Sequence, residues 1–144
     1  MPLSSQIEHA FANVPLPLGC DVFESDSEGA DELFRGRERH DLRGSDLDYH
    51  SFALRAFSPA AFAYYLPAFM IAALEDEGLG LADVLIDCLS PPSNNPSRPS
   101  FARRWLSLTR QQQAVVIAFM QHFSHRNPIA IQATVSALEA TNAG

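Results

Sequence analysis

The sequence predicts an all-α protein: one domain, residues 1–144, folded as a bundle of about five to seven helices around a buried, proline-kinked central helix. Three observations predict it. Apolar residues recur at helical spacing in several segments. Val, Ile and Thr are few and rarely alternate with polar residues, so strand signals are weak. The length of 144 residues suits one core, and a composition of 47% hydrophobic and 19% charged residues is that of a globular chain.

Residues 57–74 predict the central helix. Ser58 can cap its first turn, and Pro59 follows at a position where a missing N–H costs nothing. Apolar side chains then continue on both faces, which indicates a buried helix. Phe62, Tyr65, Leu66, Phe69, Met70 and Ala73 form one face, and the mostly small residues Ala61, Tyr64, Ala68 and Ala72 form the other. We expect the helix to close in the acidic run that starts at Glu75.

This apolar segment is 18 residues long, near the lower limit of about 17–25 residues for a membrane span. Two tyrosines near its middle and Pro67 argue against a span, and no basic cluster follows it. The N-terminus lacks the basic region and long apolar run of a signal peptide. We therefore expect a cytoplasmic protein without membrane association.

Pro67 interrupts the predicted helix. It removes the N–H that would bond the Ala63 carbonyl, at a cost of about 3 kcal/mol in a helix interior. Two interpretations stay open: a kink that shapes a pocket at Tyr64, Tyr65 and Pro67, or a bend that only fits the helix to the core. The expected donor to the freed carbonyl is a tyrosine hydroxyl or a water.

Caps and apolar spacing predict the remaining helices at residues 5–13, 27–34, 46–56, 81–89 and 109–122, and from Pro128 onward. Ser5-x-x-Glu8 and Thr109-x-x-Gln112 fit capping boxes. Residues 90–99, rich in proline and serine, are expected to form a loop.

All of these helices except the one at 27–34 have a set of residues that we expect on the apolar side. In chain order they are Ile7, Ala10, Phe11 and Val14; Leu47, Phe52 or Ala53, Leu54 and Phe57; Leu81, Val84, Leu85 and Cys88; and Ile131, Val135 and Leu138. The helix at 109–122 runs through Ala114, Val115, Ala118, Phe119 and His122.

The charged residues exclude several classes of protein. All ten basic residues are arginines, so a Walker phosphate loop, a Schiff-base lysine and a Ser-x-x-Lys acyl enzyme are ruled out. No Gly-x-Ser-x-Gly pattern is present. Residues 1–50 hold eleven acids and four arginines, a net charge of −7, whereas residues 98–144 hold five arginines and one acid, a net charge of +4. The overall balance argues against nucleic acid as a partner.

The acidic segment 21–32 is the main candidate for a binding surface. It holds six acids and no basic residue, and acid-rich surfaces attract basic partners. The candidate partner-binding residues are Asp21, Phe23, Glu24, Asp26, Glu28, Asp31 and Glu32. A solvated loop without a partner is the alternative interpretation.

Two histidine-containing groups are candidate metal sites. His122-x-x-His125 has metal-capable spacing on a helix, but no carboxylate lies beside it. The group His40, Asp41, Asp46, Asp48 and His50 matches no calcium or zinc signature, and a charged connector paired with Arg37, Arg39 and Arg43 is the simpler interpretation. We predict no metal and no cofactor. Cys20 and Cys88 are expected to be free thiols.

Several motifs resemble a family of small bacterial proteins of unknown function. The most specific is the segment from Phe57 to Phe69, Phe-Ser-Pro-x-Ala-Phe-x-Tyr-Tyr-Leu-Pro-Ala-Phe. Weaker matches are Ala10-Phe11 with Pro15 and Pro17, Phe34-Arg-Gly-Arg, and Leu108-Thr-x-x-Gln-x-Ala-Val. The tryptophan expected shortly after the Phe-Arg-Gly segment is absent. The resemblance covers about residues 7–125; it implies a single domain in a bacterial cytosol and carries over no catalytic residue.

Two functional hypotheses follow. The first is a non-enzymatic, acidic protein-binding module, an immunity-type or inhibitor-type partner of a basic protein. The second is a small-ligand-binding protein or an enzyme with a pocket at Pro67 that uses Tyr64, Tyr65 and an arginine. No catalytic residues are predicted, and the oligomeric state is left open.

Overall fold

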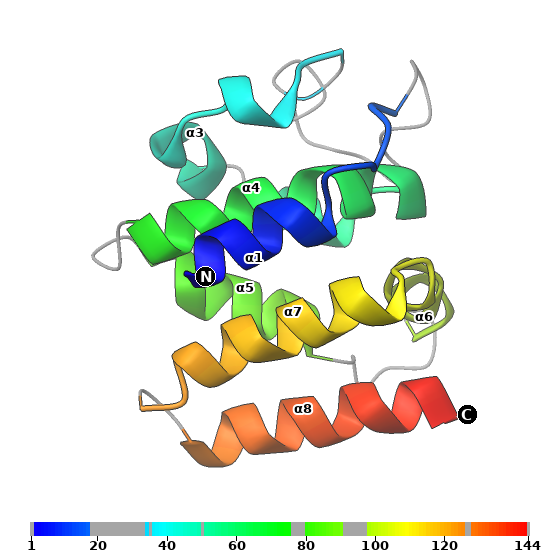
Figure 1. Cartoon of the computed structure of the whole chain (residues 1–144). Coiled ribbons are helices and arrows are strands. Elements are labelled where there is room, and N and C mark those ends of the chain that lie inside the picture. The colour runs from blue at the N-terminus through cyan, green and yellow to red at the C-terminus, as the bar shows by residue number, and fades with distance from the viewer. Residues whose placement is uncertain are drawn as a thin grey trace.

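The computed structural model describes residues 2–17, 34, 36–49, 51–75, 80–90, 98–125 and 128–143. Within these ranges it holds seven α-helices, two 3-10 helices and no strand (Figure 1). The buried apolar residues form one cluster that draws on every α-helix. The predicted all-α fold class is therefore confirmed.

The elements follow one another along the chain with α4 at the centre. In order they are α1 (Leu3–Ala10), η2 (Arg39–Asp41), α3 (Gly44–Tyr49), η3 (Ser51–Arg55), α4 (Pro59–Glu75), α5 (Leu81–Leu89), α6 (Arg98–Leu106), α7 (Arg110–His122) and α8 (Pro128–Ala143). Helix α4 contacts α1, α3, α5, α6 and both 3-10 helices. Figure 1 shows η2 and α3 on one side of α4, with α7 and then α8 on the other.

Helix α4 begins and ends where the sequence predicts. The Ser58 hydroxyl accepts a hydrogen bond from the Ala61 N–H at 3.2 Å, which caps the first turn. The helix ends at Glu75, and large and small side chains on both of its faces are buried. Pro67 lies inside the helix and is itself buried. The kink at this proline stays a prediction.

An aromatic cluster forms the core on the η2 side of α4. The ring of Phe34 lies 5.1 Å from the rings of both Phe57 and Tyr65 and 6.0 Å from Phe69, measured between centroids. Phe34, Phe57, Tyr65 and Phe69 are all fully buried. Edge-to-face pairs of this kind add about 0.5–1.5 kcal/mol beyond their buried area. The cluster therefore fixes the segment around Phe34 to α4.

The Tyr65 hydroxyl ties the same segment to α4. It donates to the carbonyl oxygens of Phe34 and, at 2.7 Å, of Arg37. Replacing Tyr65 by phenylalanine removes this donor and leaves both carbonyls without it, so the free energy of unfolding should fall by about 1–3 kcal/mol. Urea unfolding at neutral pH measures the change; a loss well under 0.5 kcal/mol would show that water replaces the hydroxyl.

Burial, with a smaller contribution from neighbouring Tyr64, also raises the pKa of the Tyr65 phenol above its usual value. The unfolded chain loses this proton near pH 10, whereas the folded chain retains it. The contribution of this group to the free energy of unfolding is therefore fully present below about pH 10. It is lost as the pH rises toward the folded-state pKa. The Tyr65→Phe variant should lack this part of the alkaline decline, which parallel urea titrations at rising pH would detect.

Two predicted helices have different bounds in the structure. Helix α1 covers Leu3–Ala10 rather than 5–13, because the Pro2 carbonyl already accepts from the Gln6 N–H and starts the bond series. No side-chain cap is present, so the Ser5 capping box is wrong. The helix expected at 46–56 is divided into α3 and η3, because α3 packs on α4 whereas η3 packs mainly on α5. The apolar sides of both segments are as predicted: Ile7, Phe11, Leu47, Ala53, Leu54 and Phe57 are buried.

Helix α6 was not predicted, and its first two residues were assigned to the loop at 90–99. Pro99 is compatible with a helix because it lies in the first turn, where its missing N–H has no partner to lose. The buried side chains of this region are Phe101, Arg104, Trp105 and Leu108, which recur at helical spacing. Most of the predicted loop lies outside the described residues.

The last two long helices follow the prediction closely. Thr109 and Gln112 form the expected capping box, with bonds of 3.1 and 2.9 Å. The buried side of α7 is formed by Val115, Val116, Phe119 and Met120, whereas Ala114 and His122 are exposed. Helix α8 begins at Pro128 and buries Ile131, Val135 and Leu138, as expected. The helix at 81–89 is confirmed as α5, with Leu81 and Leu85 buried.

Candidate functional site

The segment that leads into η2 is positioned by a tight turn. Phe34 is anchored in the aromatic cluster, and the Arg37 N–H donates to its carbonyl at 3.0 Å. Gly36 lies inside this turn with a φ of +72°, a left-handed conformation that glycine adopts without steric cost. The turn brings Arg39 over the start of α4.

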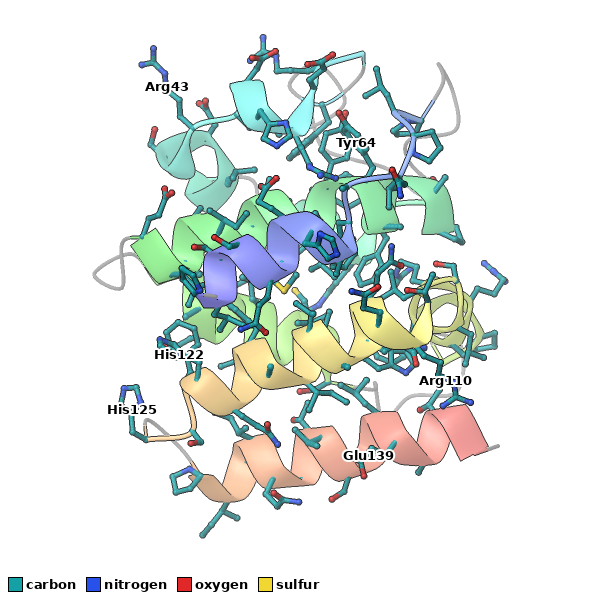
Figure 2. All side chains as sticks on the ribbon, in the orientation of Figure 1. Arg43, Tyr64, Arg110, His122, His125 and Glu139 are labelled. Carbon is teal, nitrogen blue, oxygen red and sulfur yellow. The ribbon has the colours of Figure 1, made fainter. Side chains whose placement is uncertain are left out.

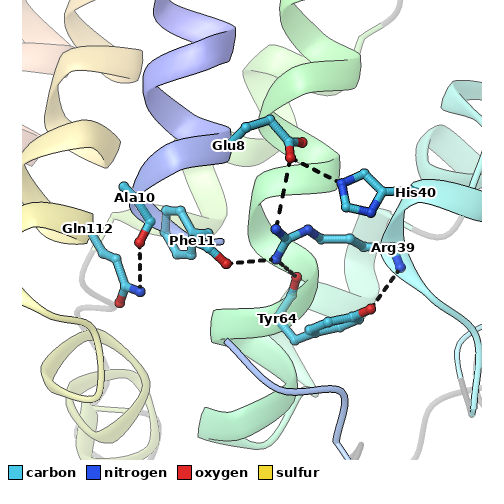
Figure 3. A network of polar contacts seen from close by, with 7 residues as sticks. All are labelled: Glu8, Ala10, Phe11, Arg39, His40, Tyr64 and Gln112. Carbon is cyan, nitrogen blue, oxygen red and sulfur yellow. Dashed lines mark hydrogen bonds and ion pairs between the residues drawn. The ribbon is translucent and has the colours of Figure 1, made fainter. Parts of the chain in front are cut away.

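Arg39 is the centre of a buried polar network, shown in Figure 3. Its side chain is 5% exposed. Nη1 donates to the carbonyls of Phe11 at 3.1 Å and Tyr64 at 3.5 Å, and the backbone N–H donates to the Tyr64 hydroxyl at 3.2 Å. The guanidinium carbon lies 5.4 Å from the centroid of the Tyr64 ring, within the range of a cation–π contact. One side chain thus joins η2, the end of α1 and α4.

The Tyr64 carbonyl lies three residues before Pro67 in α4. A proline withdraws one backbone N–H and crowds the carbonyl four residues before it, which here is Ala63. Arg39 supplies a donor to the next carbonyl, that of Tyr64. The donor predicted for the Ala63 carbonyl, a tyrosine hydroxyl or a water, stays a prediction, because Arg39 donates to the carbonyl of Tyr64 and not to that of Ala63.

Glu8 on α1 completes the network. Its Oε2 lies 3.0 Å from His40 Nε2 and 3.9 Å from Arg39 Nη2 (Figure 3). The longer distance exceeds a direct hydrogen bond, and Arg39 Nε, on the same edge of the guanidinium, is buried without a hydrogen-bond partner. Glu8 is held by His40 directly and by the charge of Arg39. Its side chain stays 42% exposed, so the carboxylate remains open to solvent.

A hollow of about 250 Å³ opens beside this network. Apolar side chains supply its base: Leu42, Leu47, Ala68, Ile71 and Ala72. Glu8, Arg39 and His40 line it as well, together with Gly44 and Glu75. The hollow therefore combines an apolar floor with charged groups from α1, η2 and the end of α4.

Five acids line the hollow or adjoin its lining residues in sequence. We call Glu8, Glu38, Asp41, Asp46 and Glu75 the acidic edge. Glu8 and Glu75 line the hollow, and the other three adjoin lining residues in sequence. Glu38, Asp41 and Glu75 are exposed, and the other two are half-buried. Arg37 and Arg43 are exposed on the same segment. The acidic edge thus has five carboxylates, and the neighbouring exposed basic groups are these two guanidinium groups.

The interpretation of this region as a simple charged connector is wrong for Arg39. That interpretation paired Arg37, Arg39 and Arg43 with acids on the surface. Arg39 instead turns inward to carbonyl oxygens and to Glu8, a residue 31 positions earlier in the chain. Its positive charge is buried, and the neighbouring acids keep their exposure.

The candidate pocket residues lie next to the hollow but do not line it. Tyr64, Tyr65 and Pro67 are buried in α4, and the hollow begins with the following residue, Ala68. The candidate partner-binding residues, Asp21, Phe23, Glu24, Asp26, Glu28, Asp31 and Glu32, lie outside the described residues. So do His50 and, apart from Phe34, the helix expected at 27–34.

The two histidine-containing groups are placed as follows. Helix α7 ends at His122, and His125 lies in the turn beyond it (Figure 2). The two side chains therefore do not share a helical face as the spacing predicted. His40 contacts Glu8 rather than the acids near it in sequence. In the part of the chain that is described, no group of three or more His, Cys, Asp or Glu side chains has metal-binding geometry.

Cys88 is a free, half-buried thiol, as predicted, and Cys20 lies outside the described residues. Burial raises the pKa of the Cys88 thiol, although neighbouring Arg55 opposes part of this effect. The thiolate is the reactive form, so in a Cys20→Ser variant alkylation at mildly alkaline pH should be slower than that of a free cysteine. Mass spectrometry of iodoacetamide labelling measures the rate; a rate equal to or above the free reference would contradict the assignment.

Sequence reasoning missed Glu8 and Arg39 as a pair. Glu8 was considered only as a capping residue, and Arg39 only as one of several arginines in a charged run. The available signal is weak: Glu8 is the one acid among residues 1–20, and Arg39 is one of four arginines at positions 35–43. The contact that joins them is made by the tertiary fold.

The comparisons with known proteins agree with this description at the level of family. None of the helices in the described ranges has the length and hydropathy of a membrane span. No curated protein and no solved structure is similar enough to this chain to count as a match. A family model, "Family of unknown function (DUF6714)", matches residues 2–140, nearly the whole chain. The resemblance to a family of unknown function is thus confirmed, and the protein belongs to the DUF6714 family.

Proposed function

We propose that this protein is a non-enzymatic binding module of the bacterial cytosol that engages a basic partner protein, as immunity-type and inhibitor-type proteins do. In this proposal the partner contacts the acidic edge and also the acids of segment 21–32. Within that segment Asp21, Glu24, Asp26, Glu28, Asp31 and Glu32 supply charge, and Phe23 supplies an apolar contact.

The burial of Arg39 is the observation that carries this proposal. An arginine at the surface would neutralise one of the acids around it. Arg39 is 6% exposed, bonds to backbone carbonyls and lies 3.9 Å from Glu8, so its charge is directed at Glu8 and away from the acids next to it in sequence. The acids Glu38 and Asp41 on either side of η2 stay exposed. A negative surface of this kind speeds encounter with a basic protein and opposes an acidic one.

The partner can be identified and then tested with purified components. The tagged protein is used for affinity capture from its source bacterium, and each captured protein is purified and titrated by calorimetry at low and high salt. A triple variant, E38Q/D41N/E75Q, tests the acidic edge, and E139Q on α8 is the control, because Glu139 is exposed at the opposite end of the molecule from Arg43 (Figure 2). A second variant set neutralises the acids of residues 21–32.

The proposal expects a basic partner whose affinity falls at least about tenfold in the triple variant and at high salt, but not in E139Q. Capture alone does not support it. An acidic partner, or a partner whose affinity is the same for the triple variant and the wild type, would overturn it.

A small-ligand site beside Pro67 is the second candidate function. The hollow favours it, because it starts at Ala68 and includes a buried arginine. Its volume of about 250 Å³ is below the roughly 300–1,000 Å³ of sites for drug-sized ligands. Tyr64 and Tyr65, the residues first considered for such a site, do not line it. We therefore rank it after protein binding.

A further inference from the structure

The hollow beside the acidic edge, which we call the socket, has a volume and a lining that suit one long side chain. It follows α4 from Ala68 to Glu75, and seven steps of about 1.5 Å give a length of roughly 10 Å. Its volume is below that of typical cofactor sites, so its dimensions favour a side chain over a whole cofactor. The hollow lies on the surface that the proposed function assigns to the partner.

The floor of the hollow suits an aliphatic stem. Leu42, Leu47 and Ile71 supply the larger apolar surfaces, and Ala68 and Ala72 keep the α4 side shallow. Basic side chains have a stem of methylene groups that can cover apolar surface while the charged head remains polar. A short polar side chain would leave this floor uncovered.

The charged groups that line the hollow suit a cationic head. Both contacts of Glu8 go to Oε2: His40 at 3.0 Å and Arg39 at 3.9 Å. Oε1 has no contact of its own among the described residues, and the carboxylate is 42% exposed. His40 and Arg39 thus position Glu8 while one oxygen remains available to an incoming donor. Two carboxylates, Glu8 and Glu75, line the hollow beside the Arg39 guanidinium and the His40 imidazole, and Glu38, Asp41 and Asp46 adjoin lining residues in sequence, so the surplus of carboxylates favours a cation over an anion.

We infer that the hollow binds an arginine side chain of the basic partner, with its stem on Leu42, Leu47 and Ile71 and its guanidinium on Glu8. This inference rests on the proposed function. Arginine is favoured over lysine because its planar fork can donate two parallel hydrogen bonds to one carboxylate. In this arrangement Glu8 is the group that contacts the partner, and His40 and Arg39 are positioning residues.

A peptide titration tests the socket without the partner. Backbone amide NMR follows the protein during addition of N-acetyl-Gly-Arg-Gly-amide, and of matched peptides that carry citrulline, which is uncharged, or glutamate. The arginine peptide should shift resonances of residues 39–47 and 68–75 in a saturable way. The citrulline peptide should bind at least about tenfold more weakly, because hydrogen bonds to charged groups are the stronger ones.

Three variants locate the contact. The affinity for the arginine peptide should fall at least about tenfold in E8Q and by a smaller factor in E75Q. It should not change in E139Q. The spectrum of each free variant shows whether it is folded. If E8Q is not folded, the test is the comparison of arginine-peptide affinity between E75Q and E139Q. The inferred arginine site would be wrong if the citrulline peptide bound as tightly as the arginine peptide, or if the glutamate peptide bound more tightly. It would also be wrong if the resonance shifts were confined to other helices.

The purified partner separates this inference from the proposed function. If the partner binds, loses affinity in the triple variant E38Q/D41N/E75Q and retains full affinity for E8Q, the socket is wrong and the acidic surface stands. If no basic partner depends on the acidic edge, the proposed function is wrong, whatever the peptide does. Loss of partner affinity in E8Q, together with arginine-peptide binding, supports both.

Discussion

Replacing Arg39 by methionine should lower the free energy of unfolding by about 2–4 kcal/mol. The variant removes the charged donor from the carbonyls of Phe11 and Tyr64, and a hydrogen bond from a charged group contributes about 1.5–3 kcal/mol. The cation–π contact with the Tyr64 ring is lost as well. Domains of this size are stable by only about 5–15 kcal/mol, so the loss is a large share of the total. Urea unfolding followed by circular dichroism measures it.

Two controls make this result interpretable. Arg43→Met removes an exposed guanidinium from the same segment and should change stability by no more than about 0.5 kcal/mol. Arg39→Lys keeps the positive charge but loses the planar guanidinium with its several donors. Its free energy of unfolding should therefore lie between those of the wild type and Arg39→Met. A methionine variant as stable as the wild type would show that the network around Arg39 does not hold η2 to α1 and α4.

Replacing Phe34 by alanine should cost about 3–5 kcal/mol. Phe34 is fully buried, and its ring contacts Phe57, Tyr65 and Phe69. Truncation loses the transfer free energy of the ring and leaves a cavity that a helix-bound cluster can close only in part. The loss should appear in urea unfolding, together with weaker near-ultraviolet circular dichroism from the remaining aromatic residues.

The matched control is Phe34→Leu, which keeps most of the apolar volume and should cost clearly less than the alanine variant. Because Phe34 anchors the segment that carries Gly36 and Arg39, the alanine variant should also speed amide exchange in η2. If the alanine and leucine variants lower the free energy of unfolding equally, the size of the Phe34 side chain and its ring contacts do not stabilise the protein as we expect. If η2 exchange is unchanged, the aromatic cluster does not position the site.

The sequence predicted those elements whose ends are marked by local chemistry. Ser58 with Pro59, and Thr109 with Gln112, are caps that act within one turn, and both are present. The burial of α4 on both faces followed from its composition, because an all-apolar helix has no side suited to water. Helix α8 likewise follows from Pro128 and the spacing of Ile131, Val135 and Leu138.

The errors arise where local signals compete. The proline-rich run before Pro99 hid the start of α6, although Phe101, Trp105 and Leu108 recur at helical spacing. Ser5 fits a capping box, but the bond between the Pro2 carbonyl and the Gln6 N–H starts the helix earlier. Spacing alone does not decide between two starts that are both compatible with a helix.

The site was beyond sequence reasoning for a different reason. Arg39 stands among acids at positions 38 and 41, so a surface pair was the simplest expectation. Its real partners are the carbonyl of Phe11, the carbonyl of Tyr64 and the carboxylate of Glu8, which lie 25 to 31 positions away. Only the packing of η2 across α1 and α4 brings them together. The prediction of a pocket near Pro67 with an arginine came closest, since the hollow begins at Ala68 and includes Arg39.

Hydrogen–deuterium exchange of the protein, alone and saturated with its basic partner, tests most directly whether the acidic edge is the binding surface. Binding should slow exchange in residues 36–47 and 68–75, which form η2, the start of α3 and the end of α4 around the hollow. Exchange in α8, where Glu139 lies at the opposite end of the molecule from Arg43, should not change (Figure 2). Slower exchange confined to α6, α7 or α8, with residues 36–47 unchanged, would contradict the assignment of the acidic edge as the partner's surface.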